Sequence, residues 1–167
     1  MVERKYLAHF IDANFDLTGQ KTNYVRLGDH LEELNVEMNP SIESTKNILG
    51  ESSAVLEGYE VSVGVDPFYI SNDENLSKKL MEIVDNEQTG DEVRTTAVDV
   101  WMKAGETADD PPVVIRATRR EVIVAVQSYG GDTTGIQIPF EMHGSQKKVK
   151  GMFDLQTKKF TEGAEGL

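Results

Sequence analysis

The chain has 167 residues, of which 17 are Lys or Arg and 29 are Asp or Glu, so its formal net charge is −12. It contains no cysteine, which excludes a disulfide framework, a Cys-ligated zinc site and a thiol nucleophile. Its length is that of about one domain, and its apolar runs are far shorter than the roughly 20 residues of a membrane span.

We therefore expect a single domain over residues 1–167. The start, Met1 to Lys5, lacks the apolar core of a secretion signal, so we expect the protein to stay in a cytoplasm or to be built into a larger particle. Residues 1–90 carry 7 basic and 17 acidic side chains (7 − 17 = −10), and residues 91–167 carry 10 and 12 (10 − 12 = −2). This skew indicates either an ordinary solvated surface or one surface with a concentrated negative field. Strong acidity also disfavours general nucleic-acid binding, because the phosphate backbone rewards positive charge.

The first half of the chain has two segments with a period of two. In residues 31–39, Leu34, Val36 and Met38 alternate with polar residues, which predicts a strand. Residues 40–54 are less regular and are interpreted as a loop. Residues 55–66 alternate again, which predicts a second strand.

One helix is expected, at about residues 74–87. Apolar residues recur there at helical spacing, and Gly90 lies just beyond as a stop signal. The apolar stripe consists of Leu76, Leu80, Met81, Ile83 and Val84.

The second half of the chain reads as strands separated by turns. Strands are predicted at residues 94–102, 113–118, 121–128, 134–143, 148–155 and 158–161. Alternating strands of this kind belong to antiparallel sheets with one wet face. The chain is therefore predicted to be mainly β with one α-helix, as an antiparallel β-sandwich or half-barrel.

The search for catalytic or metal-binding groups gives little. The three histidines, His9, His30 and His143, are not spaced to share a strand face or a helical turn. We therefore expect no enzyme activity, no metal site and no cofactor. The small basic clusters Arg119-Arg120 and Lys147-Lys148-Lys150 are interpreted as a turn and as the guard of an edge strand.

The polar face of residues 55–66 is unusual, because Gly, Glu, Ser, Gly and Asp follow one another without a long basic side chain. A solvated sheet face usually mixes both charges. This composition suits a smooth negative wall.

Three stretches together resemble the tail tube (major tail) proteins of long-tailed bacteriophages and related phage-derived particles. Residues 45–51 with 58–61 are similar to the loop and second strand of that group. Residues 65–69 leading into the helix resemble its strand–helix transition. Residues 138–141, 149–154 and 157–160 resemble its closing strands.

This resemblance implies a β-sandwich flanked by a helix. Six copies would form a ring, and four strands from each would join into a shared 24-stranded barrel around a channel. Stacked rings would form a virion tail tube that is assembled in the host cytoplasm. The tube would conduct DNA without binding it specifically, and no membrane would be a partner. The implied partners are further copies of the chain, the tail terminator, the baseplate or tip, the tape measure protein and, in contractile particles, a sheath protein.

The resemblance also supplies candidate residues. Acidic channels are common in such tubes, and the candidates for the channel wall are Glu33, Glu37, Glu60, Ser62 and Asp66. The long loop at about residues 40–54 would reach the neighbouring ring, and its candidate contacts are Asn47, Ile48, Leu49 and Glu51.

Other functions stay open at this point. A β-sandwich could recognise a carbohydrate or another protein, although such a module needs an aromatic-bearing face that these alternations do not supply. The chain could also be the tube subunit of a contractile bacteriocin or injection particle. An enzyme is the least supported reading, because no nucleophile–base pair is visible.

Overall fold

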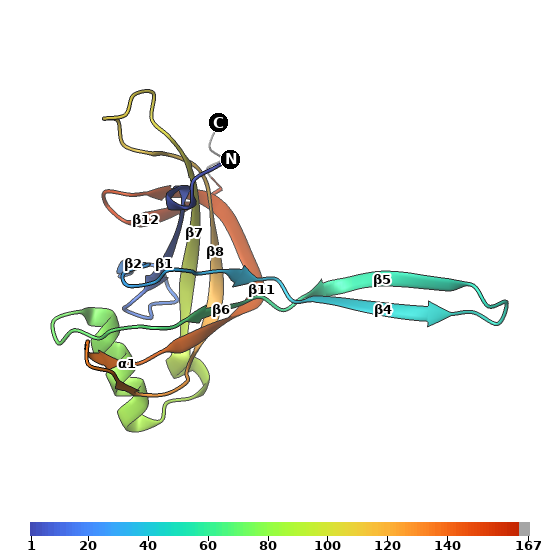
Figure 1. Ribbon diagram of the computed structural model, residues 1–167, viewed down its shortest axis with the longest axis horizontal. Coiled ribbons are helices and arrows are strands. Elements are labelled where there is room, and N and C mark those ends of the chain that lie inside the picture. Colours follow the sequence, from blue (N-terminus) through green and yellow to red (C-terminus); the bar gives the residue numbers. More distant parts are fainter. Residues whose placement is uncertain (164–167) are drawn as a thin grey trace.

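The structure is a computed structural model that describes residues 1–163, and it consists mainly of β-strands with one α-helix (Figure 1). Residues 164–167, the end of the expected domain, lie outside this range. The strands are β1 Leu7–Asp12, β2 Tyr24–Leu27, β3 Val36–Glu37, β4 Pro40–Lys46, β5 Ser52–Tyr59, β6 Ser62–Val65, β7 Arg94–Lys103, β8 Val113–Val126, β9 Gly130–Gly131, β10 Ile136–Gln137, β11 Phe140–Asp154 and β12 Lys159–Glu162. The helix α1 spans Asn75–Asn86. Short 3-10 helices at Arg4–Tyr6 and Gly90–Val93 precede β1 and β7.

Eight strands form one antiparallel sheet in the order β2-β1-β7-β8-β11-β6-β3, with β12 paired to β11. The expected mainly β, antiparallel fold with a single helix is confirmed. The expected sandwich fits only loosely, because hydrogen bonds join these strands into a single bent sheet. Strands β4 and β5 form a separate hairpin, and β9 and β10 form another.

The long central strands pass through two different cores. In the half of the sheet next to α1, one face is buried in a core that includes Val122, Phe140 and Leu80. In the other half, the opposite face is buried in a second core that includes Val98, Ala117 and Phe153. Val122 and Ala117 lie on opposite faces of β8, because successive strand residues alternate. In each half of the sheet, one face therefore packs on a core and the opposite face does not.

The helix confirms the predicted apolar stripe. Leu76, Leu80 and Ile83 are buried, and Met81 and Val84 pack partly against the same core. The helix ends without Gly90: Glu87 takes the left-handed conformation (φ 48°) at the C-cap, and Gly90 begins the following 3-10 helix.

The first half of the chain differs from the sequence prediction. Only residues 36–37 of the expected strand 31–39 are extended, and the expected loop 40–54 is the hairpin of β4 and the start of β5. The expected strand 55–66 is divided between β5 and β6. Asn39 has a positive φ of 45°, and its side-chain amide donates to the Glu60 carbonyl (2.9 Å), so a turn separates the hairpin from the sheet.

Two further differences concern missed or merged strands. Strands β1 and β2 were not expected, and the strands expected at 113–118 and 121–128 form the single strand β8. All residues of β1 except Leu7 are buried, so β1 has no polar alternation by which to recognise it.

Candidate functional site

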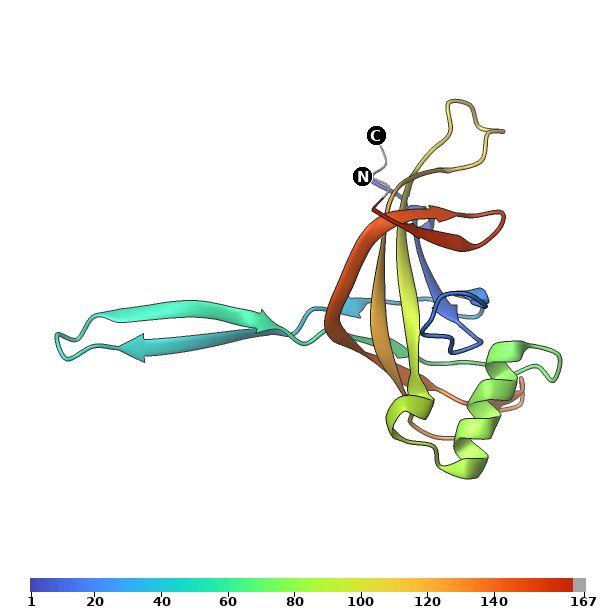
Figure 2. The ribbon, with the colours of Figure 1, turned by 180° about the vertical axis from the view of Figure 1, so that it is seen from behind.

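The hairpin of β4 and β5 projects from the body as an arm (residues 40–59). In the two opposite views of Figures 1 and 2, no other element lies beside its strands. Every residue of β4 is exposed, and so is every residue of β5 except Gly58. An isolated two-stranded hairpin is at best marginally stable in water. The arm therefore lacks the packing that would normally stabilise a hairpin of this length.

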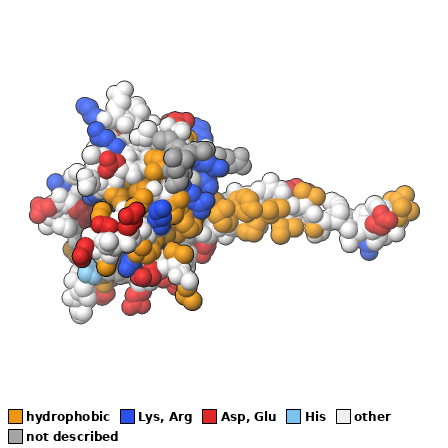
Figure 3. Space-filling view, turned by 90° about the horizontal axis from the view of Figure 1, so that it is seen from above, with side chains coloured by type: hydrophobic (Ala, Val, Ile, Leu, Met, Phe, Trp, Pro, Cys, Tyr) orange, Lys and Arg blue, Asp and Glu red, His pale blue; other side chains and the backbone are white. Residues whose placement is uncertain are grey.

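The two faces of the arm differ in chemistry. Ile42 lies directly opposite Leu56, and the strand register places their neighbours on alternate faces. One face carries the apolar residues Pro40, Ile42, Ala54, Leu56 and Tyr59. Figure 3 shows hydrophobic side chains gathered along the half of the arm nearest the body. This apolar surface is of the kind that usually marks an interaction site.

The opposite face of the arm carries two carboxyl groups, Glu43 and Glu57. Glu57 is the extra residue where the register shifts between Ser41 and Ile42. A hydrogen bond from Glu43 raises the pKa of the Glu57 carboxyl above its ordinary value. The two carboxyl groups therefore lie close together on this face.

The tip of the arm is ordered by Asn47. Its side-chain oxygen accepts the backbone N–H groups of Leu49 and Glu51, each at 3.0 Å, and its amide donates to the Glu51 carboxylate. Ile48 and Leu49 are left 102% and 78% exposed. The four residues proposed from the sequence as inter-ring contacts are thus brought together at one tip.

A polar sheet face lies in the half of the sheet that packs against α1, on the side away from α1 and the first core. Glu37, Ser62 and His143 are successive cross-strand partners on β3, β6 and β11. Glu141 lies on the same face, and its carboxylate contacts His143 Nε2 at 3.2 Å. We refer to Glu37, Ser62, Gly64, Glu141 and His143 as the polar face.

The channel candidates named from the sequence are not all on the polar face. Glu37 and Ser62 belong to it, and Glu60 and Asp66 are exposed just beyond the two ends of β6. Glu33 lies in the irregular segment before β3 and accepts a hydrogen bond from Asn35 instead. Glu141 and His143 were not among the candidates, although their alternation in residues 134–143 was the signal that could have found them.

A groove of about 770 Å³ lies on the exposed face of the other half of the sheet. It has an apolar lining that includes Leu7, Trp101 and Ile115. Its basic residues are Arg4, Arg116, Arg120, Lys148 and Lys150, and we call it the basic groove. The Arg116 guanidinium stacks 4.7 Å from the Trp101 ring centroid, and Trp101 is still 41% exposed.

Within residues 1–163, none of the five groove cations forms an ion pair. The acidic residue lining the groove, Asp99, is held by buried His9, whose Nδ1 lies 2.6 Å from the Asp99 carboxylate. The Arg4 guanidinium donates to the Leu34 carbonyl and Arg120 to the Ser145 carbonyl. In the described part of the chain, these five cations therefore have no carboxylate partner at ion-pair distance.

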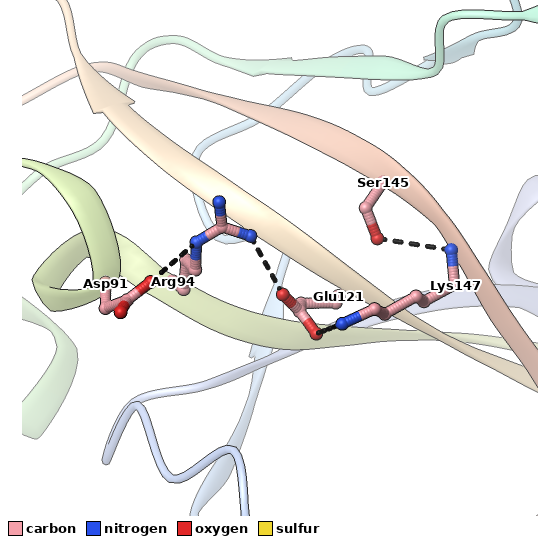
Figure 4. A network of polar contacts seen from close by, with 5 residues as sticks. All are labelled: Asp91, Arg94, Glu121, Ser145 and Lys147. Carbon is pink, nitrogen blue, oxygen red and sulfur yellow. Dashed lines mark hydrogen bonds and ion pairs between the residues drawn. The ribbon is translucent and has the colours of Figure 1, made fainter.

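Neighbouring cations behave differently. Figure 4 shows Glu121 between Arg94 and Lys147, with its two carboxylate oxygens 3.0 and 3.6 Å from their nitrogens. Arg94 also contacts Asp91 at 3.1 Å. These two cations on the same sheet therefore have the carboxylate partner that the five groove cations lack.

The groove corrects the interpretation of the two basic clusters. Arg120 and Lys148 lie neither at a turn nor on an edge, because β8 and β11 are central strands of the sheet. Gly144 on β11 leaves room for Arg120, since a Cβ there would lie 2.5 Å from the Arg120 Cδ.

Comparison with known proteins gave no match, either to a family model or to a curated protein. Across the described residues, no group of three or more His, Cys, Asp or Glu side chains is placed to hold a metal ion. A search of the same part of the chain found no helix with the length and apolar character needed to cross a membrane.

Proposed function

We propose that this protein is a self-assembling structural subunit of a tube, of the type found in the tails of long-tailed bacteriophages. Six copies form a ring with a shared 24-stranded barrel, rings stack into a tube, and the tube conducts DNA during ejection. The observation that carries the proposal is the arm, which exposes an apolar face and an apolar tip in a single copy.

Open sheet edges support assembly as well. Among the described strands, β2 and β3 each pair on one side only. Exposed edges invite pairing with another chain, and closing a sheet into a barrel removes them. Strand β3 is joined to the arm by the two residues Met38 and Asn39, so this edge of the sheet and the arm would meet neighbouring copies together.

The polar face supplies the channel wall in this proposal. Its carboxylates, Glu37 and Glu141, and the nearby Glu60 and Asp66 would repel the phosphates of DNA. Cations at the same positions would pair with phosphates and retain the polymer. A ring repeats each wall residue once per copy, so a small effect at one residue is multiplied along the tube.

The other partners follow from the same proposal. A tube needs a terminator, a baseplate or tip and a tape measure protein, and a contractile particle adds a sheath. The finished tube belongs to the virion tail, after assembly in the bacterial cytoplasm. The tube subunit of a bacteriocin or injection particle would share all of these surfaces except the DNA cargo.

The proposal is tested by negative-stain electron microscopy of the purified chain over a concentration series, with and without sonicated tube fragments as seeds. We expect rings or regularly striated tubes. A matched variant, Ile48→Ser with Leu49→Ser, keeps the fold but removes the apolar tip and should not form tubes. A wild-type chain that stays monomeric at high concentration in both conditions would refute the proposal.

A further inference from the structure

We infer that the basic groove is the receptor for the arm of a second copy of this chain. This inference rests on the proposed function, because it takes neighbouring copies as partners. It adds the site on the body that the arm occupies.

The first step is the charge of the groove. Five cations line it, and its carboxylate Asp99 is held by His9. Arg120 and Lys148 are direct cross-strand partners, a like-charge arrangement that costs stability in a sheet. Such an arrangement is reasonable if an anionic partner neutralises it.

The second step is the match with the arm. The arm carries three carboxylates, Glu43, Glu51 and Glu57, against the single cation Lys46. Its exposed tip residues Ile48 and Leu49 fit the apolar lining of the groove. The arm therefore combines the two chemistries, acidic and apolar, that the groove combines in complementary form.

The third step is the position of the two surfaces. Met38 lines the groove two residues before the arm begins, and the arm extends away from the body (Figures 1 and 2). No residue of the arm lines the groove of its own copy. Arm and groove are thus different surfaces of one molecule, so their contact is head-to-tail and propagates from copy to copy into rings or filaments.

Disulfide trapping between copies tests the inference, because the natural chain has no cysteine. Leu49→Cys is mixed with Ile115→Cys, which lies in the groove, or with the control Ile123→Cys. The two isoleucines are 39% and 37% exposed, and Ile123 does not line the groove. Both mixtures are oxidised mildly under conditions in which the wild-type chain assembles.

We expect the Leu49→Cys and Ile115→Cys pair to cross-link and the Ile123→Cys control not to. We also expect Lys148→Glu with Lys150→Glu to raise the concentration for half-assembly about tenfold or more, and Glu43→Lys with Glu51→Lys to restore it. Assembly without a cross-link at Ile115→Cys would overturn the groove as receptor and leave the tube proposal standing. A wild-type chain that does not assemble would overturn both.

Discussion

Arg120 on β8 and Lys148 on β11 lie directly opposite each other in the sheet, next to the register shift between Gly144 and Lys148. Two cations as cross-strand partners destabilise a sheet that folds as a single copy. In a chain with a net charge of −12, suitable carboxylates were available to pair with them, as Glu121 does with Arg94 and Lys147. In the proposed assembly, an acidic segment of a neighbouring copy would neutralise this pair.

The variant Lys148→Glu should therefore stabilise the single copy. Replacing a like-charge pair by an opposite-charge pair is worth about 0.2–1 kcal/mol in the free energy of unfolding. Urea denaturation at low protein concentration measures the change. The control Lys78→Glu makes the same charge change on the exposed side of α1, away from any cationic partner, and should give no gain. A lower stability of Lys148→Glu than of wild type would refute the like-charge cost.

Identical truncations at two leucines should separate the core from the arm. Leu80→Ala leaves a cavity under α1, where Leu80 is fully buried, and should cost about 2–5 kcal/mol in the free energy of unfolding. Leu49→Ala removes a side chain in water and should change that free energy by less than about 0.5 kcal/mol. Thermal or urea unfolding measures both. When equal concentrations of folded protein are compared, Leu49→Ala should impair assembly and Leu80→Ala should not. Normal assembly of Leu49→Ala would argue against the tip as a contact.

The Glu43 and Glu57 pair makes the arm sensitive to pH. The pKa of Glu57 is raised in the folded arm, so its protonated form is favoured there. The resulting stabilisation is fully present below the ordinary pKa of 4.5 and is lost as the pH rises through the higher folded-state value. A carbon-detected NMR titration of the Glu57 carboxyl should show the upward shift, and Glu43→Gln should remove it. An unshifted Glu57 in wild type would contradict the close pairing.

Charge reversal on the proposed channel wall should make the proposed tubes retain DNA. Glu60→Lys and Glu141→Lys tubes should still assemble, because both side chains lie outside the cores. They should then retain duplex DNA in a salt-dependent manner, since new cations pair with phosphates. The control Asp85→Lys makes the same charge change on α1. Co-sedimentation of tubes with DNA measures retention, and equal retention by all three variants would place Glu60 and Glu141 outside the channel.

The sequence predicted those elements whose two faces differ in burial. Strand β7 and helix α1 were predicted to within one residue at each end, because their apolar residues repeat with the period of the element. Residues 40–54 of the arm were interpreted as a loop because both faces of the arm are exposed, so burial imposes no alternation on residues such as Ser41, Ser44 and Thr45. Strand β1 was missed for the opposite reason, since both of its faces are buried.

Of the candidate surfaces, the sequence indicated the arm tip but not the basic groove. The four arm-tip residues are consecutive or nearly so, and they were found together from the sequence. The basic groove was not found, because Arg116 and Lys150 are far apart in the chain and only the pairing of β8 with β7 and β11 brings them together. Its cations looked like separate small clusters with ordinary roles.

A cryo-electron microscopy reconstruction of the assembled chain tests the central claim most directly. The account predicts rings in which β3 and the arm of each copy contact neighbouring copies, with the polar face towards a central channel. It is contradicted by an assembly in which the arms remain in solvent, or in which the channel is lined by Arg116, Lys148 and Lys150 instead of Glu37 and Glu141.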